Sequence, residues 1–287
     1  LTPYFLKEMT SILAKHHINI LRIDNTDHKH LRSLEIYAVT NRKFPEKKVK
    51  EALFLLSHTH QVDIALMKDN MFKSSKRLVV FDMDSTLIQG EIIDEMAKRK
   101  GVEKEIAAIT SLAMNGKMDF ATSLKKRMQK LQGLSTKDLI SIRKKIKLTE
   151  GTLPFIKTLQ KLGFKTAVIS GGFSFFTDHL KKELKLNYAF ANHLEIKNNK
   201  LTGKVLSPIL DAKKKATILK QIAKKENISL EQVVAIGDGA NDIPMLNTAG
   251  LGIAFHAKET VKKNSPYHMG HGPMTSILYF LGIKNTR

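Results

Sequence analysis

The chain has 287 residues, enough for one large or two medium domains. Its hydrophobic content of 42% and charged content of 26% are ordinary for a soluble globular protein, and no apolar run is long enough to cross a membrane. Lys and Arg total 48 against 27 Asp and Glu, and this net charge of +21 favours an anionic partner such as nucleic acid, an anionic membrane or a phosphorylated substrate. Because the basic residues are spread along helices without a nucleic-acid-binding motif, we expect neither nucleic acid nor a membrane as the partner.

The sequence contains no cysteine, which excludes disulfides and thiolate chemistry and fits a reducing compartment. The N-terminus also lacks the basic start and apolar core that are typical of a signal peptide. Together these two observations predict a cytoplasmic protein.

The first 75 residues predict a small α+β domain. Its elements follow in this order: a helix from Tyr4 to His16, strands over 18–24 and 32–40, a helix over 46–60 and a strand over 62–67. One more strand before Leu1 would complete the βαββαβ order of a ferredoxin-like unit. The missing strand and the absent initiator Met lead us to expect that the natural chain begins earlier. The polar stretch 68–76 has no periodicity and indicates a linker.

From Lys76 onward the pattern predicts a doubly wound (Rossmann-like) α/β fold with a parallel sheet. Short apolar runs alternate with helical segments, and they cover residues 79–81, 165–170, 233–239 and 251–255. The connection from Phe81 to Lys165 is far longer than one crossover helix needs. We expect its excess, about residues 91–150, to form a helical cap over the strand ends. The predicted domains are therefore 1–75 and 76–287.

Two carboxylates, Asp82 and Asp84, follow the apolar run 79–81 directly. Side chains along a strand alternate between faces, so these two are expected to point the same way. They would lie beyond the carboxyl end of the strand, where doubly wound sheets carry their sites. Like charges this close repel each other, which calls for a cation or a proton between them.

Polar groups also follow two other predicted strands. Asp238, Asn241 and Asp242 lie after the third apolar run, and acidic and amide oxygens of this kind are typical ligands of Mg²⁺. Ser170 with two following glycines, and Lys213 in a helical segment, are suited to binding an anion. Each motif alone is also typical of a turn, a helix cap or a surface lysine. Their ordered recurrence at three strand ends favours a metal-assisted phosphate site.

Four motifs resemble those of the haloacid dehalogenase superfamily, in the same order: "FDMDSTL", "VISGGF", "DAKKKATIL" and "IGDGANDIPML". The surrounding stretches, including "GEIIDEMA" and "AGLGIAFHAK", are similar to the phosphoserine phosphatases of that superfamily. The resemblance covers roughly residues 76–258. Residues 1–70 resemble, more weakly, a small-molecule-binding regulatory domain of the ACT type.

The resemblance implies a role for each matching residue. Asp82 would be the nucleophile that forms an aspartyl-phosphate, and Asp84 the general acid and then the general base. Mg²⁺ would be held by the Asp82 side chain, the Asp84 backbone carbonyl and the Asp238 side chain. The other implied roles are phosphoryl binding by Ser170, Gly171 and Lys213, a phosphoryl contact by Asn241, support by Thr86 and Asp242, and recognition of the substrate's ammonium by Glu91 and its carboxylate by Arg127.

Three functions are open on the sequence. The first is a Mg²⁺-dependent phosphoserine phosphatase that hydrolyses O-phosphoserine in the last step of serine biosynthesis. The second is a phosphatase or phosphotransferase of the same superfamily acting on another small phosphate ester, and Glu91 and Arg127 argue against it. The third is a basic binding protein with a decayed enzyme core, against which stands the filled set of catalytic positions. A homodimer and an amino-acid effector bound to residues 1–75 are further expectations.

The histidine-rich segments 58–60 and 268–272 have no acidic neighbours in a metal-binding pattern. We therefore expect their histidines to be surface or loop residues.

Overall fold

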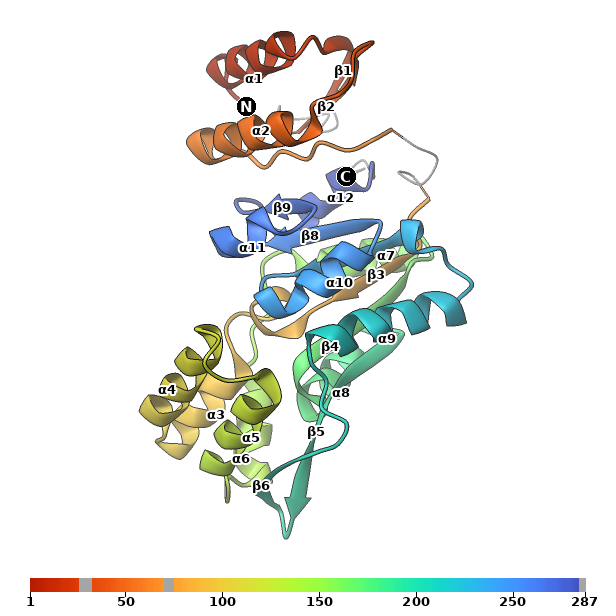
Figure 1. Ribbon diagram of the computed structural model, residues 1–287. Helices are drawn as coiled ribbons and strands as arrows, with labels where there is room; N and C mark the ends of the chain where they lie inside the picture. The colour runs from red at the N-terminus through yellow and green to blue at the C-terminus, as the bar shows by residue number, and fades with distance from the viewer. Residues whose placement is uncertain (26–32, 70–74, 284–287) are drawn as a thin grey trace.

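The computed structural model describes residues 1–25, 33–69 and 75–283. A small N-terminal part lies at one end of a larger part that is built on a seven-stranded sheet (Figure 1). The small part has its own core, made by apolar side chains such as Phe5 and Leu53 on its two helices. Its elements are α1 (Pro3–Lys15), β1 (Asn19–Asn25), β2 (Leu34–Val39) and α2 (Glu46–His60).

The strand expected over residues 62–67 is a wrong prediction. These residues run without strand pairing after α2, and β1 pairs antiparallel with β2 alone in the small sheet. A strand needs a neighbour for its backbone hydrogen bonds. Among the described residues, β1 and β2 pair only with each other, and residues 62–67 pair with neither strand. The central residues of the expected linker, 70–74, lie outside the described part of the chain.

The larger part confirms the predicted doubly wound fold. Its strand order is β6-β5-β4-β3-β7-β8-β9, with β3 in the middle and parallel to both of its neighbours. An antiparallel hairpin of β5 and β6, which the sequence analysis did not predict, forms one edge. The strands are β3 (Leu78–Phe81), β4 (Lys165–Phe173), β5 (Tyr188–Lys197), β6 (Lys200–Leu206), β7 (Val233–Gly237), β8 (Leu251–Phe255) and β9 (Tyr267–Met269).

Helices cover both faces of this sheet because β3 is apolar on both sides. Val79 and Phe81 belong to one buried cluster, and Leu78 and Val80 to another. The first cluster is shared with α7 (Thr152–Lys161), α8 (Ser174–Glu183) and α12 (Ile277–Phe280), and the second with α9 (Ala212–Lys225) and α10 (Ile243–Thr248). The carboxyl end of β3 therefore opens in the middle of the sheet edge, with buried protein on both sides.

Four helices lie in the range predicted as an insertion, and we call residues 91–150 the cap. They are α3 (Ile92–Lys100), α4 (Glu103–Met114), α5 (Phe120–Lys130) and α6 (Thr136–Lys144), grouped together beyond one end of the sheet (Figure 1). The chain leaves and re-enters the core side by side, because Ile88 and Leu148 form an isolated antiparallel bridge. The cap also touches the β5–β6 hairpin, where the Gly133 N–H donates to the Leu201 carbonyl at 2.8 Å.

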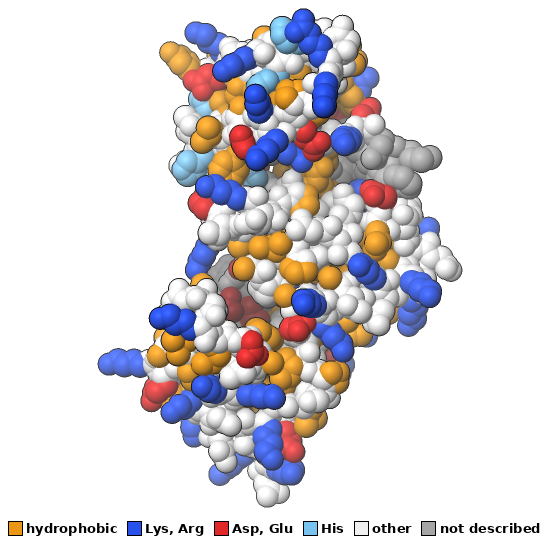
Figure 2. Space-filling model, viewed as in Figure 1, with side chains coloured by type: hydrophobic (Ala, Val, Ile, Leu, Met, Phe, Trp, Pro, Cys, Tyr) orange, Lys and Arg blue, Asp and Glu red, His pale blue; other side chains and the backbone are white. Residues whose placement is uncertain are grey.

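The surface carries its positive charge in a dispersed form. Figure 2 shows Lys and Arg side chains scattered over the visible face of the cap, the core and the N-terminal part. Among the described residues, no helix combines the length and apolar character needed to cross a membrane.

Candidate active site

Asp82 is a buried carboxylate at the end of the central strand. Asp82 is the first residue after β3, and its backbone N–H donates to the Ile236 carbonyl of β7 at 2.9 Å. The chain then turns through η1 (Met83–Leu87), where Ser85 adopts a positive φ of 53°. β3 ends at Phe81, so strand alternation does not extend to Asp82 and Asp84, although burial and, to a lesser extent, the charge of Asp84 do raise the pKa of the Asp82 carboxylate. It is the wide turn that sets the direction of Asp84.

Lys215, and not the predicted Lys213, lies in this site. Lys215 Nζ is 2.6 Å from Asp82 Oδ1 and 2.7 Å from Asp242 Oδ1, and all three side chains are buried. Lys213 is exposed on the same helix, α9. Two residues along a helix turn the side chain by about 200°, so both lysines cannot face the site. A signal was present in the sequence, because Lys215 shares the i, i+3, i+4, i+7 spacing of the buried residues Ile218, Leu219 and Ile222.

The two acidic partners keep Lys215 charged. Burial alone would lower the pKa of its ammonium, but the charges of Asp242 and Asp82 outweigh burial, and the net effect is a raised pKa. A buried lysine that stays protonated is a fixed positive charge beside the Asp82 carboxylate. Asp82 Oδ2 accepts no hydrogen bond from the described residues, which leaves this oxygen available for chemistry.

Three carboxylates in the site are close enough to share a cation. Ligand oxygens of Asp82, Asp238 and Asp242 all lie within 4.8 Å of one another. Burial and the neighbouring Asp242 raise the pKa of Asp82, and the same two causes raise the pKa of Asp238 to about 6. Thr86 Oγ1 donates to Asp238 Oδ1 at 3.0 Å and so orients that carboxylate. An all-oxygen set of crowded carboxylates fits a hard divalent cation such as Mg²⁺, whose charge would oppose the raised pKa values.

Asp84 has the properties of a general acid near neutral pH. Its Oδ1 accepts from the Ile92 N–H at 2.9 Å, at the start of α3. Burial, followed by the charge of Glu91, raises the pKa of Asp84 to about 7. A carboxyl group with this pKa can give up or take a proton at neutral pH.

The predicted anion-binding loop approaches Asp84 closely. Ser170 is buried at the end region of β4, and its Oγ donates to Asp84 Oδ2 at 3.4 Å. The Gly172 N–H donates to Ser170 Oγ at 2.8 Å. A Cβ atom on Gly172 would lie only 2.8 Å from Asp84 Oδ2, so a glycine is required for this approach. Asn241 lies in η3 (Ala240–Asp242), after β7, with its side chain against Gly239.

The cap contributes the remaining predicted residues. Glu91 is partly open to solvent and accepts a hydrogen bond from Ser85 Oγ at 2.8 Å. The protein that surrounds the rest of its side chain raises the pKa of its carboxyl group. Burial also lowers the pKa of Arg127, although Glu91 and Asp94 act in the opposite direction. The buried Nε of Arg127 has no hydrogen-bond partner, so a donor is left for an anionic group. Phe120 lies over the anion-binding loop, since its ring would be 3.2 Å from a Cβ on Gly171.

The arrangement combines a buried carboxylate with one available oxygen, a fixed ammonium, a set of cation ligands, a carboxyl group with a pKa near neutrality and a loop suited to an anion. This combination can stabilise attack of Asp82 on a phosphoryl group. The predicted residues Asp82, Asp84, Thr86, Ser170, Asp238 and Asp242 are brought together at one edge of the sheet, and Lys213 is excluded from it.

The comparisons with known proteins agree with this geometry. A family model described as haloacid dehalogenase-like hydrolase matches residues 76–250. A phosphoserine phosphatase of Archaeoglobus fulgidus is 52% identical over 201 residues, which are 70% of this chain and 58% of that protein. A phosphoserine phosphatase of Saccharomyces cerevisiae is 39% identical over 279 residues, 96% of this chain and 89% of that protein. The chain thus spans less than three-fifths of the length of the Archaeoglobus relative.

Solved structures show the same relationship. A haloacid dehalogenase family hydrolase of Salmonella enterica serovar Typhi superposes with a TM-score of 0.86 at 32% identity, covering 99% of this chain and 95% of that one. A phospho-aspartyl intermediate analogue of phosphoserine phosphatase superposes with a TM-score of 0.68 at 45% identity, covering 72% of this chain and 99% of that one. The two curated relatives described above are phosphoserine phosphatases, and the chain itself belongs to the haloacid dehalogenase-like hydrolases.

Proposed function

We propose that this chain is a Mg²⁺-dependent phosphoserine phosphatase that converts O-phosphoserine and water to serine and phosphate. The observation that carries the proposal is the buried contact of Lys215 with Asp82 and Asp242 at the end of β3. The names of the matched relatives support the choice of substrate. The proposal replaces Lys213 by Lys215 and keeps the other predicted residues.

We assign the metal to the Asp82 side chain, the Asp238 side chain and the Asp84 backbone carbonyl, beside Asp242. When bound, Mg²⁺ supplies positive charge that stabilises the phosphoryl oxygens. The rest of the chemistry falls to the residues of the chain.

In the first step, a carboxylate oxygen of Asp82 attacks phosphorus, and the bond from phosphorus to the serine oxygen breaks. Two like charges ~4 Å apart repel by roughly 4 kcal/mol at an effective dielectric near 20, so an anionic nucleophile needs help to approach a phosphate. The ammonium of Lys215, beside Asp82, counters this repulsion, and the Ser170 hydroxyl and Gly171 N–H take phosphoryl oxygens. Asp84 gives its proton to the leaving serine oxygen.

In the second step, the aspartyl-phosphate is hydrolysed. Asp84, now a carboxylate, takes a proton from water, whose oxygen attacks phosphorus. The bond from phosphorus to Asp82 breaks, which restores the Asp82 carboxylate and releases phosphate. One residue can serve both steps because the first leaves it in the protonation state that the second requires.

Selectivity for the serine part is assigned to the cap. Arg127, with its unpartnered buried donor, would grip the substrate carboxylate, and Glu91 would take its ammonium. An arginine can hold a carboxylate through two parallel hydrogen bonds, which a single amine cannot do. The proposed place of this reaction is the last step of serine biosynthesis in the cytoplasm. A homodimer, and an amino-acid effector bound at residues 1–75, remain expectations.

The test is phosphate release from three esters, with and without Mg²⁺: O-phosphoserine, phosphoethanolamine and phosphoglycolate. We expect Mg²⁺-dependent turnover with a large preference for O-phosphoserine. Equal or faster turnover of another ester would favour the second function left open by the sequence, a phosphatase or phosphotransferase that acts on another small phosphate ester. Absence of turnover with every ester in the presence of Mg²⁺ would favour a decayed core.

A further inference from the structure

Asp63 joins the N-terminal part to the C-terminal loop of the larger part. Its carboxylate accepts three backbone N–H groups, from Gly270 at 2.6 Å, His271 at 3.2 Å and Gly272 at 3.1 Å. Successive N–H groups that converge in this way form a concave anion site. Hydrogen bonds to a charged group are stronger than bonds between neutral groups, and Asp63 accepts three of them, so this contact holds the loop in place.

The loop that Asp63 holds is built for close approach. A Cβ atom on Gly272 would lie 2.5 Å from Ser276 Oγ, so a larger residue there would displace the following turn. The Gly272 carbonyl meets His256 Nε2 at 2.9 Å on the side of the core. Residues 270–272 are therefore fixed between the N-terminal part and the end of β8.

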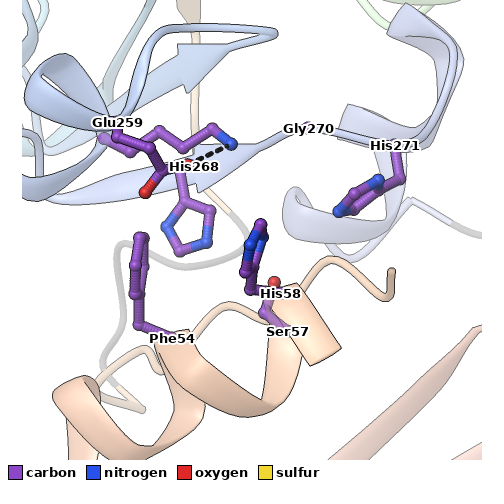
Figure 3. Close-up of a pocket in the computed structure, with 8 residues that line it drawn as sticks. Phe54, Ser57, His58, Glu259, His268, Gly270 and His271 are labelled. Carbon is purple, nitrogen blue, oxygen red and sulfur yellow. Dashed lines mark hydrogen bonds and ion pairs between the residues drawn. The ribbon is translucent and has the colours of Figure 1, made fainter. Parts of the chain in front are cut away.

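Figure 3 shows the same junction at close range, where Phe54, Ser57 and His58 of α2 face His268 and His271. The cavity between them measures about 10 Å³, room for about one water molecule. Phe54 and His268 pack edge to face with ring centroids 5.0 Å apart. The two histidine-rich segments, whose histidines were expected to be surface or loop residues, thus meet across this junction, which leaves little space between the two parts.

The clamped loop leads directly to the segments that carry the cap. Immediately after it comes η4 (Met274–Ser276), where the buried Met274 donates its N–H to the Glu150 carbonyl at 2.9 Å. Gly151 fits against the same turn, since a Cβ there would be 2.9 Å from the Thr275 nitrogen. Glu150 and Gly151 belong to the return path from the cap to α7. We call residues 87–91 and 147–152, where the chain enters and leaves the cap, the hinge; it includes both ends of the cap.

The hinge in turn holds the turn that bears Asp84. The Thr149 N–H donates to the Leu87 carbonyl at 3.0 Å, and the Gln89 N–H to the Lys147 carbonyl at 2.9 Å. The buried Thr152 hydroxyl contacts both the Leu87 carbonyl, at 3.4 Å, and the Met274 sulfur, at 3.5 Å. Leu87 is the last residue of η1, which contains Asp84. Hydrogen bonds and short chain segments thus run without a break from Asp63 to the candidate active site.

We propose that docking of the N-terminal part through Asp63 sets the position of the cap hinge and so favours the closed cap, by which we mean the arrangement with Phe120 over Gly171. Asp63 is a positioning residue in this scheme, because it acts through residues 270–276. In the structure, the hinge is held in the conformation in which Phe120 lies over Gly171. Releasing Asp63 loosens the hinge and lowers the fraction of molecules with a closed cap. The apparent affinity for substrate then falls in proportion to that fraction. The activity part of this inference rests on the proposed phosphatase function, while the hinge part does not.

The test compares wild type with Asp63→Asn, Asp63→Glu and a matched control, Asp69→Asn, in the full chain. Asp69 is an exposed residue of the same extended segment, so its substitution makes the same charge change away from the loop. In Asp63→Asn, an NH₂ donor replaces one acceptor oxygen and faces backbone N–H donors. Asp63→Glu keeps the carboxylate and is expected to restore part of the wild-type behaviour.

Hydrogen exchange gives the first readout, and it needs no substrate. The amides of Met274, Thr149 and Gln89 should exchange ~5-fold faster or more in Asp63→Asn, the lower end of typical coupling between sites. The Asp82 amide, inside the sheet, should be unchanged, and Asp69→Asn should match wild type. Faster exchange confined to residues 270–272 would overturn the proposal and leave Asp63 as a docking contact only.

Kinetics on O-phosphoserine gives the second readout. KM should rise ~5-fold or more in Asp63→Asn, with kcat changed by less than about twofold, since the reacting groups are untouched. An unchanged KM, or a fall in kcat alone, would overturn the link to the cap. If wild type releases no phosphate from O-phosphoserine, the proposed function fails, and the exchange of the hinge amides still decides the coupling.

Discussion

Lys215 Nζ lies 2.6 Å from Asp82 Oδ1, and both side chains are buried where the central strand ends. An ammonium in this position holds one oxygen of the proposed nucleophile, and in the proposed reaction its positive charge lies beside the incoming phosphoryl group. Lys213, two residues earlier on the same helix, is exposed. Lys213 and Lys215 are therefore a matched pair for mutagenesis, because they share residue type and helix but lie on different faces.

Lys215→Ala should lose nearly all phosphatase activity, and Lys213→Ala should stay within about twofold of wild type. Lys215→Arg is expected to fail as well, because a planar guanidinium cannot replace a compact ammonium held between Asp82 and Asp242. Steady-state phosphate release on O-phosphoserine measures all three, with circular dichroism as a check on folding. Similar losses in Lys213→Ala and Lys215→Ala would contradict the assignment of the lysine.

Asp82→Asn should abolish turnover, since an amide cannot form the acyl-phosphate. Asp84→Asn should slow turnover by ~10²–10⁴, the usual contribution of a general acid or base. Acid-quenched wild-type enzyme should carry labelled phosphate from labelled substrate. Label that persists in Asp82→Asn would show that the nucleophile is a different residue.

The strand ends could be predicted from sequence because the chemistry is local there. Asp82, Ser170 and Asp238 each follow an apolar run, and parallel strands bring their carboxyl ends to one edge. The β5–β6 hairpin was missed although a signal was present. Asn198 and Asn199, both with positive φ, connect its strands, and Asn is favoured in such two-residue turns.

Other features depend on tertiary contacts that no local pattern contains. The apolar alternation around 62–67 is typical of a strand, yet pairing also needs a neighbouring strand, and these residues pair with none among the described part of the chain. Asp63, in the same segment, meets residues 270–272, more than 200 positions away. A carboxylate that binds backbone N–H groups has no partner side chain to search for, and so this contact could be found only in the folded chain.

The junction around His268 should make stability depend on pH. Burial lowers the pKa of His268 from its ordinary 6.5; Lys262 and His271 act in the same direction, and Asp63 and Glu259 oppose them. The unfolded chain then binds more protons than the folded chain between the two pKa values, so stability rises with pH across that window. The contribution is complete above about pH 6.5 and is lost as the pH falls toward the folded-state pKa.

Urea unfolding between about pH 8 and about pH 5 tests this dependence against His268→Gln, which does not titrate. Wild type should lose more stability than the variant as the pH falls. An NMR titration of the His268 ring should give a pKa below 6.5. Equal losses in the two proteins would show that His268 does not carry this pH dependence.

Deleting residues 1–75 should leave a folded phosphatase, because the larger part has its own buried clusters on both faces of the sheet. Its kcat should stay near that of the full chain, while its KM should rise as in Asp63→Asn, since the Asp63 contact is lost. Size-exclusion chromatography and steady-state kinetics measure both properties. Aggregation would instead indicate that the deletion exposes the apolar surface of the larger part against which Met67 packs.

Arg127 and Glu91 are the residues on which the substrate assignment depends. O-phosphoserine carries a carboxylate and an ammonium, and phosphoethanolamine lacks the carboxylate. A site built around a buried polar partner can reject a substrate without the matching group by roughly 10⁴, because its own group is left unpaired. Wild-type kcat/KM should therefore strongly favour O-phosphoserine.

Arg127→Ala should remove most of the activity on O-phosphoserine and much less of the activity on phosphoethanolamine, which narrows the gap between them. Arg127→Lys should restore only part of the preference, because a single ammonium does not reproduce the planar fork of the guanidinium. The buried Nε of Arg127 is consistent with carboxylate recognition, because it is a donor that finds no acceptor among the described residues. If Arg127→Ala lowered kcat/KM equally for both esters, the residue would serve cap folding rather than carboxylate recognition, and the substrate would have to be sought among other phosphate esters.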